Sequence, residues 1–383
     1  MGYPKVTYKE EGMREGMQIE DASIPIEDKV RLLDALSDTG LKHIIVGSFV
    51  SPRYTPQMAE IDEVVTRFTP RPGVRYTALA LNERGRERAR KHSPPLSMGP
   101  DDTGRSSTNC HLCDVFVRRN SNRSQAQEIA GWAPTIAEAA KDGVTEAGIG
   151  LSAAWGSNFV GGFTLDDRME MLTRQHTLWD DAGISVTGVS LGDPMSWNMP
   201  HEVAAQLDAI KQRWPSVRDF TLHLHNARGM AIVSAYAALQ ALDEDDTLHL
   251  DGTIGGIGGC PYCGNGRTTG QMPTEDIINM LEEMGIETGV DLDRLIDCVW
   301  ILEEMLGRST MGHVSKAGPR PRSREGWYDP NAPFIETFEE ARHFKLGPGA
   351  YEGGIYPWRE PIRSEQRPET LGITELPANA VRT

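Results

Sequence analysis

Apolar positions along residues 3–251 alternate between two spacings, one typical of buried strands and one typical of amphipathic helices. Residues 43–49 form a short apolar run rich in β-branched side chains, whereas Val30, Leu33 and Leu36 are spaced to cover one face of a helix. This alternation of strand and helix recurs along the chain. The predicted strands are residues 3–8, 43–49, 75–81, 113–117, 146–153, 184–191, 220–225 and 247–251.

Eight strands separated by helices predict an α/β fold, a (β/α)8 TIM barrel, over residues 1–310. An open doubly wound sheet is disfavoured, because no glycine-rich dinucleotide loop follows the first strand. Residues 93–109 break the alternation with proline, glycine, serine and aspartate, and we interpret them as an insertion. Residues 311–383 form a C-terminal extension rich in proline, glycine and aromatic residues. We expect it to pack on the barrel or on a partner subunit, as a lid or a dimer arm.

The charge balance excludes some classes of partner. A formal net charge of −16 disfavours nucleic acids and anionic membrane surfaces, because both bind basic stripes. The sequence has no apolar run of transmembrane length and no apolar segment of a signal peptide at its start. We therefore predict a cytoplasmic enzyme that binds a small molecule and forms a homodimer or a higher homo-oligomer.

His223 and His225 are separated by one residue in the predicted strand 220–225. Side chains alternate along a strand, so both imidazoles lie on one face. If that face points into the barrel, the two rings can share a divalent cation. Two buried histidines that are satisfied by hydrogen bonds are the alternative interpretation.

Further polar residues follow the C-terminal ends of predicted strands, where TIM barrels carry their catalytic groups. Arg14 and Glu15 follow the first strand, Asp193 the sixth, and Cys260 the eighth. A carboxylate with two imidazoles makes a site for Mg²⁺ or Mn²⁺, or for Zn²⁺. Arg14 can stabilise an enolate oxygen, Asp193 can act as a general base, and Cys260 as a proton donor. A surface ion pair, a turn aspartate and a small buried thiol are the structural alternatives.

Several short motifs occur in one order. They are REGMQ at residues 14–18, SFVSP at 48–52, SLGD at 190–193, HLHN at 223–226, GGCPY at 258–262 and TED at 274–276. In these motifs the chain resembles the 3-hydroxy-3-methylglutaryl-CoA (HMG-CoA) lyase branch of the DRE-TIM metallolyases, from about residue 5 to residue 318. The resemblance implies a metal-dependent barrel that cleaves or forms a carbon–carbon bond next to a carbonyl, usually in a CoA thioester, through an enolate.

The resemblance also implies roles for individual residues. The implied metal ligands are Glu15, His223, His225 and Gln271. Arg14 would stabilise the enolate, Asp193 would be a catalytic acid or base, and Cys260 would donate a proton. The implied substrate contacts are Gln18 and Asn226.

Three positions depart from the family pattern. Glu15 stands where the family has aspartate, and Gln271 where it has asparagine, with Asn265 as an alternative amide out of register. Ile45 occupies the place of a catalytic glutamate in the second strand. We therefore predict a carbon–carbon lyase for a 3-hydroxyacyl substrate, a CoA thioester other than standard HMG-CoA. The alternatives are a synthase of the isopropylmalate, homocitrate and citramalate type, which joins an acyl-CoA to a 2-oxoacid, and a non-catalytic barrel.

Two CxxC pairs leave a further alternative. Cys110, Cys113, Cys260 and Cys263 could bind a structural zinc ion or act as redox pairs. We do not favour the zinc site, because the fourth and eighth strands lie far apart around a barrel.

Overall fold

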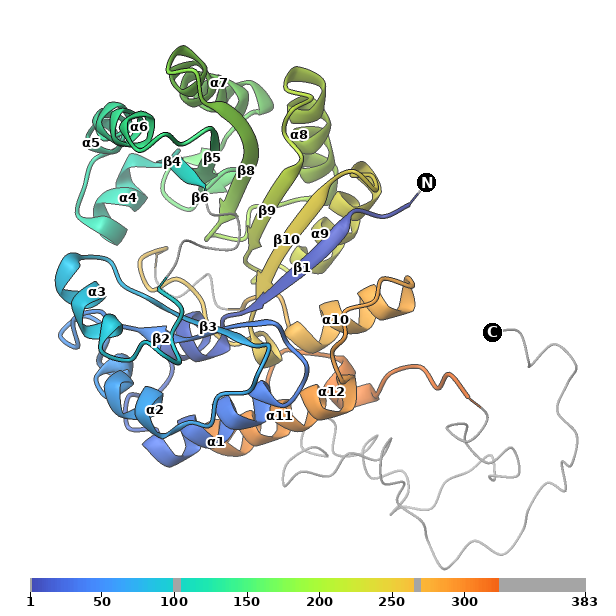
Figure 1. Cartoon of the computed structure of the whole chain (residues 1–383). Coiled ribbons are helices and arrows are strands. Elements are labelled where there is room, and N and C mark those ends of the chain that lie inside the picture. Colours follow the sequence, from blue (N-terminus) through green and yellow to red (C-terminus); the bar gives the residue numbers. More distant parts are fainter. Residues whose placement is uncertain (1, 99–104, 265–269, 324–383) are drawn as a thin grey trace, which may run out of the picture.

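Eight parallel strands form one sheet in this computed structural model, which describes residues 2–98, 105–264 and 270–323 (Figure 1). Their order in the sheet is β3-β2-β1-β10-β9-β8-β5-β4. The strands are β1 (Lys5–Glu10), β2 (His43–Ser48), β3 (Arg75–Leu79), β4 (Ser106–His111), β5 (Glu146–Ser152), β8 (Ser185–Asp193), β9 (Asp219–Leu224) and β10 (Thr247–Gly252). A small antiparallel hairpin joins β6 (Gly156–Ser157) to β7 (Gly161–Gly162).

The first and last strands of this sheet pair with each other. Lys5 of β1 lies opposite Thr247 of β10, and the ladder runs in register to Glu10 and Gly252. On either side of this pair, each strand pairs with the next strand of the sheet along the sequence, which is the order of a TIM barrel. The predicted fold is therefore confirmed. The strands at the two ends of the order are β3 and β4, and no ladder joins them within the described residues.

Helices cover the outer side of the strands (Figure 1). The longer ones are α1 (Ile26–Ser37), α2 (Ile61–Arg67), α3 (Glu83–Arg90), α4 (Asp114–Ser121), α5 (Gln125–Ala130), α6 (Trp132–Lys141), α7 (Leu165–Asp181), α8 (Pro200–Arg213), α9 (Ala231–Ala241), α10 (Thr274–Glu283) and α11 (Leu292–Leu306). The short ones are η1 (Gly12–Gly16), η2 (Met17–Ile19), η3 (Pro56–Met58), η4 (Ile254–Gly256) and α12 (Val314–Ala317).

Local sequence explains how two of these helices start and pack. Thr164 begins α7 with a capping box, because its hydroxyl accepts from the Asp167 N–H while the Asp167 carboxylate accepts from the Thr164 N–H. In α1, Leu33 and Leu36 are fully buried, as the helical spacing predicts. They belong to one apolar core that the sheet shares with its helices.

The fourth strand is the main correction to the predicted elements. Residues 113–117, predicted as a strand, include the cap and first turns of α4, and the strand is β4 at Ser106–His111. The predicted insertion 93–109 therefore overlaps β4 at its end. In the β4 sequence SSTNCH the two buried side chains, Thr108 and Cys110, are small. The strand therefore lacks the alternation of large apolar and polar residues that predicts a strand.

Two other predicted segments also differ from the structure. The helix predicted over residues 125–141 is two helices, α5 and α6, which meet at Gly131. The aromatic part of the C-terminal extension lies outside the described residues, so its role as a lid or dimer arm stays a prediction. Among the described helices, none has both the length and the apolar character needed to cross a membrane.

Candidate active site

The loop predicted after the first strand folds into the π-helix η1, which carries Arg14 and Glu15. The backbone N–H groups of Arg14, Glu15 and Gly16 lie 3.0, 2.8 and 3.2 Å from the Glu11 carbonyl oxygen. Single π turns are rare and are frequent at functional sites. The turn presents two charged side chains directly beyond the end of β1.

The loop after β10 packs closely against η1. Gly258 has a φ of +102°, and a Cβ atom there would lie 2.6 Å from the Glu15 carbonyl oxygen. The Gln18 side chain donates from Nε2 to the Gly259 carbonyl at 3.1 Å. Together, the glycine and this hydrogen bond place the Cys260 loop beside η1.

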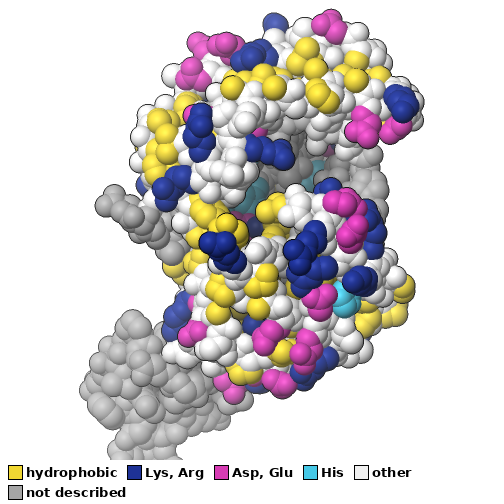
Figure 2. Space-filling view, turned by 90° about the vertical axis from the view of Figure 1, so that its left-hand side faces the viewer, with side chains coloured by type: hydrophobic (Ala, Val, Ile, Leu, Met, Phe, Trp, Pro, Cys, Tyr) yellow, Lys and Arg dark blue, Asp and Glu magenta, His cyan; other side chains and the backbone are white. Residues whose placement is uncertain are grey.

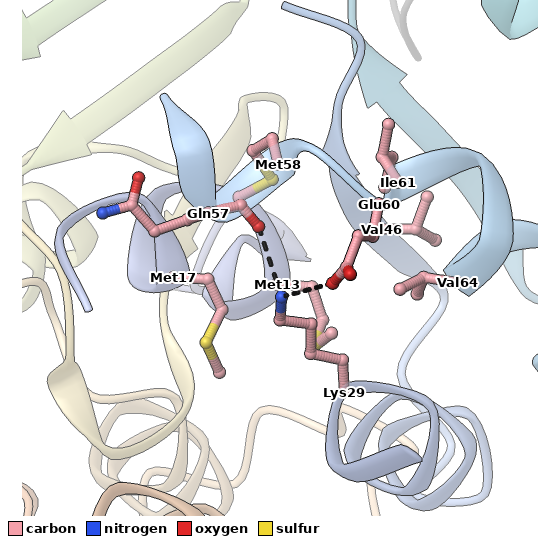
Figure 3. A pocket seen from close by; sticks show the side chains of 9 residues that line it. All are labelled: Met13, Met17, Lys29, Val46, Gln57, Met58, Glu60, Ile61 and Val64. Atoms are coloured by element: carbon pink, nitrogen blue, oxygen red, sulfur yellow. Dashed lines mark hydrogen bonds and ion pairs between the residues drawn. The ribbon is translucent and has the colours of Figure 1, made fainter. Parts of the chain in front are cut away.

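A cavity of about 20 Å³ lies next to η1 (Figure 3). Met13 and Met17 line it together with the buried Lys29, whose Nζ lies 3.4 Å from the Gln57 carbonyl and 3.8 Å from the Glu60 carboxylate. Methionine side chains adapt to irregular gaps. The cavity is too small for a substrate, and its lining supports η1.

The two histidines and Glu15 meet on one side of the sheet. Glu15 Oε1 lies 3.1 Å from His225 Nε2, and Glu15 Oε2 lies 3.5 Å from His223 Nε2. The two Nε2 atoms are 3.2 Å apart. Both imidazoles thus lie on the same face, as the alternation predicts.

Gln271 reaches the same point. Its Nε2 lies 2.8 Å from His225 Nε2, and its Oε1 is buried without a hydrogen bond among the described residues. The oxygen and nitrogen of a side-chain amide are assigned from their contacts, and a half-turn would aim Oε1 at the histidines. Asn265, the alternative amide, lies outside the described residues.

The spacing of these atoms fits a divalent cation. Neighbouring ligands about 2.1 Å from an octahedral ion lie about 3 Å from one another. The separations of 3.1, 3.2 and 2.8 Å match that value. Carboxylate, imidazole and amide donors together suit Mg²⁺, Mn²⁺ or Zn²⁺.

Charged neighbours dominate the electrostatics of the cluster. Burial alone would raise the pKa of Glu15, but Arg14 and His223 outweigh burial and hold the pKa well below its usual range. Burial would lower the pKa of His223, but Asp251 and Glu15 outweigh it and raise that pKa well above the usual value. Such strong stabilisation of positive charge beside Glu15 is the environment that a cation site requires.

A second group lies on the other side of His223. His223 Nδ1 lies 2.8 Å from Asp251 Oδ1, and Glu11 offers an oxygen within 4.8 Å of both residues. Lys9 already places its Nζ 3.3 Å from Glu11 and 3.7 Å from Asp251. The lysine ammonium neutralises this group, and the Asp251 contact fixes the orientation of the His223 ring.

Asp193 is absent from the groups with ligand spacing in the described part of the chain. Its Oδ2 accepts from the backbone N–H and the side-chain amide of Asn198, at 2.7 and 2.6 Å. The same amide donates to the His225 carbonyl at 3.0 Å. Asp193 Oδ1 is buried without a hydrogen bond among the described residues. Asn198 therefore ties the end of β8 to the residue that follows β9.

Asn226 and Cys260 occupy different settings. Asn226 Oδ1 accepts from the Ala231 N–H at 2.9 Å and so holds the start of α9. Cys260 is partly exposed, in the loop beside η1. The substrate contact predicted for Asn226 and the proton transfer predicted for Cys260 stay predictions.

The cysteines do not form the alternative zinc site. Cys113 and Cys263 are buried in one apolar cluster with Met195, so the two loops meet, contrary to our expectation that the barrel separates them. Within the described part of the chain, the groups with ligand spacing contain histidine, glutamate and aspartate, and cysteine is absent from them. All five cysteines lie outside disulfides.

Lys9, Glu11 and Asp251 were missed by the sequence analysis. Asp251 ends the eighth predicted strand, so the rule that identified Arg14 and Cys260 applied to it as well. Lys9 and Glu11 follow the predicted end of the first strand at residue 8, so the same rule applied to them, although β1 itself runs to Glu10. Asn198 gives no signal in the sequence, since its contacts join residues distant along the chain.

Comparison with known proteins decides the family. The family model described as HMGL-like matches residues 5–300. The chain belongs to this family. It is 33% identical over 309 residues to the hydroxymethylglutaryl-CoA lyase YngG of Bacillus subtilis, an alignment that covers 80% of this chain and 96% of that protein. It is 31% identical over 328 residues to the (R)-citramalyl-CoA lyase of Chloroflexus aurantiacus, with 82% and 95% covered.

A solved structure supports the same assignment of this HMGL-like chain. The HMG-CoA lyase of Pseudomonas aeruginosa aligns with a TM-score of 0.64 and 29% identity, over 83% of this chain and 98% of that one. The resemblance inferred from the motifs is therefore confirmed. Figure 2 shows a hollow in the surface with histidine side chains inside it and lysine and arginine side chains around it.

Proposed function

We propose that this HMGL-like protein is a divalent-metal-dependent carbon–carbon lyase that cleaves a 3-hydroxyacyl-CoA. The observation that carries the proposal is the convergence of Glu15, His223 and Gln271 on His225 Nε2, from which their nearest side-chain atoms lie 3.1, 3.2 and 2.8 Å away. The relatives named as HMG-CoA and citramalyl-CoA lyases support the reaction class, because both act on CoA thioesters with a hydroxyl group at C3.

Four residues are the metal ligands in this proposal. Glu15, His223, His225 and Gln271 hold the cation, with Mg²⁺ or Mn²⁺ favoured over Zn²⁺ because half of the donors are oxygen atoms. When bound, the cation orients the substrate oxygens and lowers the pKa of the substrate hydroxyl. The longer side chains of Glu15 and Gln271 still converge on the histidines, so the departures from the family pattern preserve the centre.

The remaining residues stabilise and protonate the enolate. Arg14 is held by Glu15 through Nη1, at 2.6 Å, and its buried Nε has no hydrogen bond among the described residues. That N–H is available to donate to the enolate oxygen. Cys260, in the adjoining loop, donates a proton to the enolate carbon. Gln18 positions that loop, and Asn226 is a further substrate contact.

Direct assay tests the proposal. The purified protein, loaded with Mg²⁺ or Mn²⁺, is incubated with HMG-CoA, citramalyl-CoA and longer 3-hydroxyacyl thioesters, and the shorter acyl-CoA and the carbonyl product are quantified. We expect cleavage of at least one thioester, and loss of both stoichiometric metal and turnover in the His223→Ala/His225→Ala variant. Retained turnover in that variant would refute the metal centre.

A matched control separates ligation from folding. His249 lies on neighbouring β10 and contacts Thr7 at 2.7 Å and Asp219 at 3.3 Å, away from the four ligands. His249→Ala should keep its metal and its turnover within about threefold, since surrounding polar groups can be rehydrated. Free CoA released from acetyl-CoA and a 2-oxoacid would instead support the synthase alternative.

A further inference from the structure

Glu11 is a buried carboxylate in the site to which no role is assigned above. It follows β1 directly and is 3% exposed. Its Oε2 lies 3.0 Å from Arg14 Nη2, and it offers an oxygen within 4.8 Å of the facing atoms of His223 and Asp251. A carboxylate beside both the enolate stabiliser and a metal ligand lies within reach of a bound substrate.

Two atoms of this charged pair are left without hydrogen bonds. Glu11 Oε2 and Arg14 Nε are both buried and make no hydrogen bond among the described residues; Oε2 has its ion pair with Arg14 Nη2, whereas Nε has no partner. A buried polar atom without a partner costs roughly 1–3 kcal/mol, so such atoms call for an explanation. One is an acceptor and the other a donor. A 3-hydroxyacyl thioester offers the complementary groups, a hydroxyl donor and a carbonyl acceptor.

Glu11 lies one residue beyond the single pair that joins β1 to β2. Glu10, the last residue of β1, pairs with Ile44 of β2, and Glu11 and Ile45 are the residues that follow this pair in the chain. Ile45 stands where the lyases carry a catalytic glutamate in the second strand. Glu11 therefore supplies a carboxylate just beyond the end of the strand that neighbours β2.

Asp193, the acid or base predicted from the sequence, has a different setting. One of its carboxylate oxygens is engaged twice by Asn198, and that amide also holds the carbonyl of His225. These contacts suit a residue that fixes the ends of β8 and β9. Glu11, in contrast, has an ion pair with Arg14 and a place beside His223.

We propose that Glu11 is the catalytic base that removes the proton from the substrate's 3-hydroxyl group, an inference that rests on the proposed lyase function. Glu11 Oε2 takes the hydroxyl proton, and the O–H electron pair forms the carbonyl of the leaving product. The bond between C2 and C3 breaks, and its electron pair becomes the enolate of the acyl-CoA, which Arg14 stabilises. Cys260 protonates C2, and the proton held by Glu11 then passes through solvent to the Cys260 thiolate.

The test compares two reactions of the metal-loaded Glu11→Gln variant. Cleavage of the 3-hydroxyacyl-CoA needs a base for the hydroxyl, whereas exchange of the product thioester's α-protons with D₂O needs only Arg14 and Cys260. We expect kcat for cleavage to fall by about 10²–10⁴-fold, with KM and metal content within threefold of wild type. The exchange rate should also stay within threefold.

Relocation of the carboxylate gives a second test. Ile45→Glu in the Glu11→Gln background returns an acid from the neighbouring strand, and we expect it to recover at least tenfold of the lost cleavage rate. Glu10→Gln is the matched control, because Glu10 is adjacent and buried but is held by hydrogen bonds; its cleavage rate should stay within threefold.

Each outcome decides the assignment. Cleavage by Glu11→Gln at a rate near wild type overturns it while the lyase function stands. Parallel loss of cleavage and exchange also overturns it, because Glu11 would then act only by holding Arg14. A wild-type protein that performs neither reaction refutes the proposed function, and the assignment of Glu11 falls with it.

Discussion

Glu10 and Glu11 are neighbours in the chain, both are buried, and they lie in opposite environments. Glu10 is the last residue of β1, and Glu11 begins the turn into η1. Glu10 Oε1 accepts from the backbone N–H groups of Gly12, at 2.6 Å, and Ile254, at 2.9 Å, and Oε2 accepts from the Thr274 hydroxyl. Glu11 instead faces Arg14 and Lys9 and keeps one oxygen without a hydrogen bond.

The difference separates a carboxylate held by hydrogen bonds from the one that we propose as the catalytic base. Burial raises the pKa of Glu10 to about 7, against the opposing effect of its hydrogen bonds, so the neutral acid is favoured there. At Glu15, burial would raise the pKa, but Arg14 and His223 outweigh it and hold the pKa well below its usual range. Burial alone therefore does not identify a catalytic acid. What distinguishes Glu11 from Glu10 is its ion pair with Arg14 and its place within 4.8 Å of His223.

The largest effect is expected from replacing Arg14, the cation that is paired with Glu11. Arg14→Gln removes the guanidinium that Glu11 and Glu15 hold, at 3.0 and 2.6 Å. We expect kcat/KM for thioester cleavage to fall by about 10³-fold, close to the loss of a strong oxyanion donor. Steady-state kinetics measure it, with metal content determined in parallel. A loss below tenfold would show that the enolate is stabilised elsewhere.

The next effect concerns the stability contributed by Glu10. Its folded-state pKa of about 7 exceeds the ordinary value of 4.5, so the folded state retains a proton that the unfolded chain releases. The contribution of Glu10 to the free energy of unfolding is therefore fully present below pH 4.5 and is lost as the pH rises through about 7. Glu10→Gln has no such loss, and we expect it to gain up to about 3 kcal/mol over wild type between pH 5 and pH 8.

Denaturant unfolding of both proteins at pH 5, 6, 7 and 8 measures this difference in unfolding free energy. The other ionisable groups titrate in both proteins, so their effects cancel in the difference. The pH dependence of this difference in unfolding free energy therefore comes from position 10. A difference that does not change with pH would mean that Glu10 is ionised in the folded protein at all these values.

A smaller effect is expected at Gln271, the amide end of the metal cluster. Gln271→Ala removes one donor beside His225 and should weaken metal affinity by about 100-fold, the upper end of the loss when a supporting group of a site is removed. Isothermal titration with Mn²⁺ measures it. Gln271→Asn is the matched comparison, since it keeps the amide and shortens its reach. Equal affinities for all three proteins would remove Gln271 from the ligand set.

The smallest effect is expected at Gln18. Its hydrogen bond to the Gly259 carbonyl positions the Cys260 loop, and a single such bond contributes about 1 kcal/mol net. We therefore expect Gln18→Ala to lower kcat for cleavage by roughly fivefold. Thermal unfolding should show a change of the same small size. A change in KM alone would favour the substrate contact predicted from the sequence.

Residues close in sequence or linked by strand alternation were the ones that could be predicted. The HxH pair needed only the two-residue period of β9, and Arg14, Glu15 and Cys260 needed only the rule that barrel sites lie at strand ends. The polar strand β4 was missed because its small and polar side chains carry no apolar alternation. Glu11 follows the predicted end of the first strand, so the rule of strand ends applied to it as well, although β1 itself runs to Glu10.

The amino-acid sequence by itself determined the family, the alternating order of strands and helices, and the identity of most groups in the proposed metal site. These features depend on local periodicity and on motifs in a fixed order. The tertiary structure decided the π-turn that brings Glu15 to the histidines, the contact of Gln271 with His225, and the opposite fates of Glu10 and Glu11. These depend on which distant residues face each side chain, and strand pairing and packing settle that only once the barrel has formed.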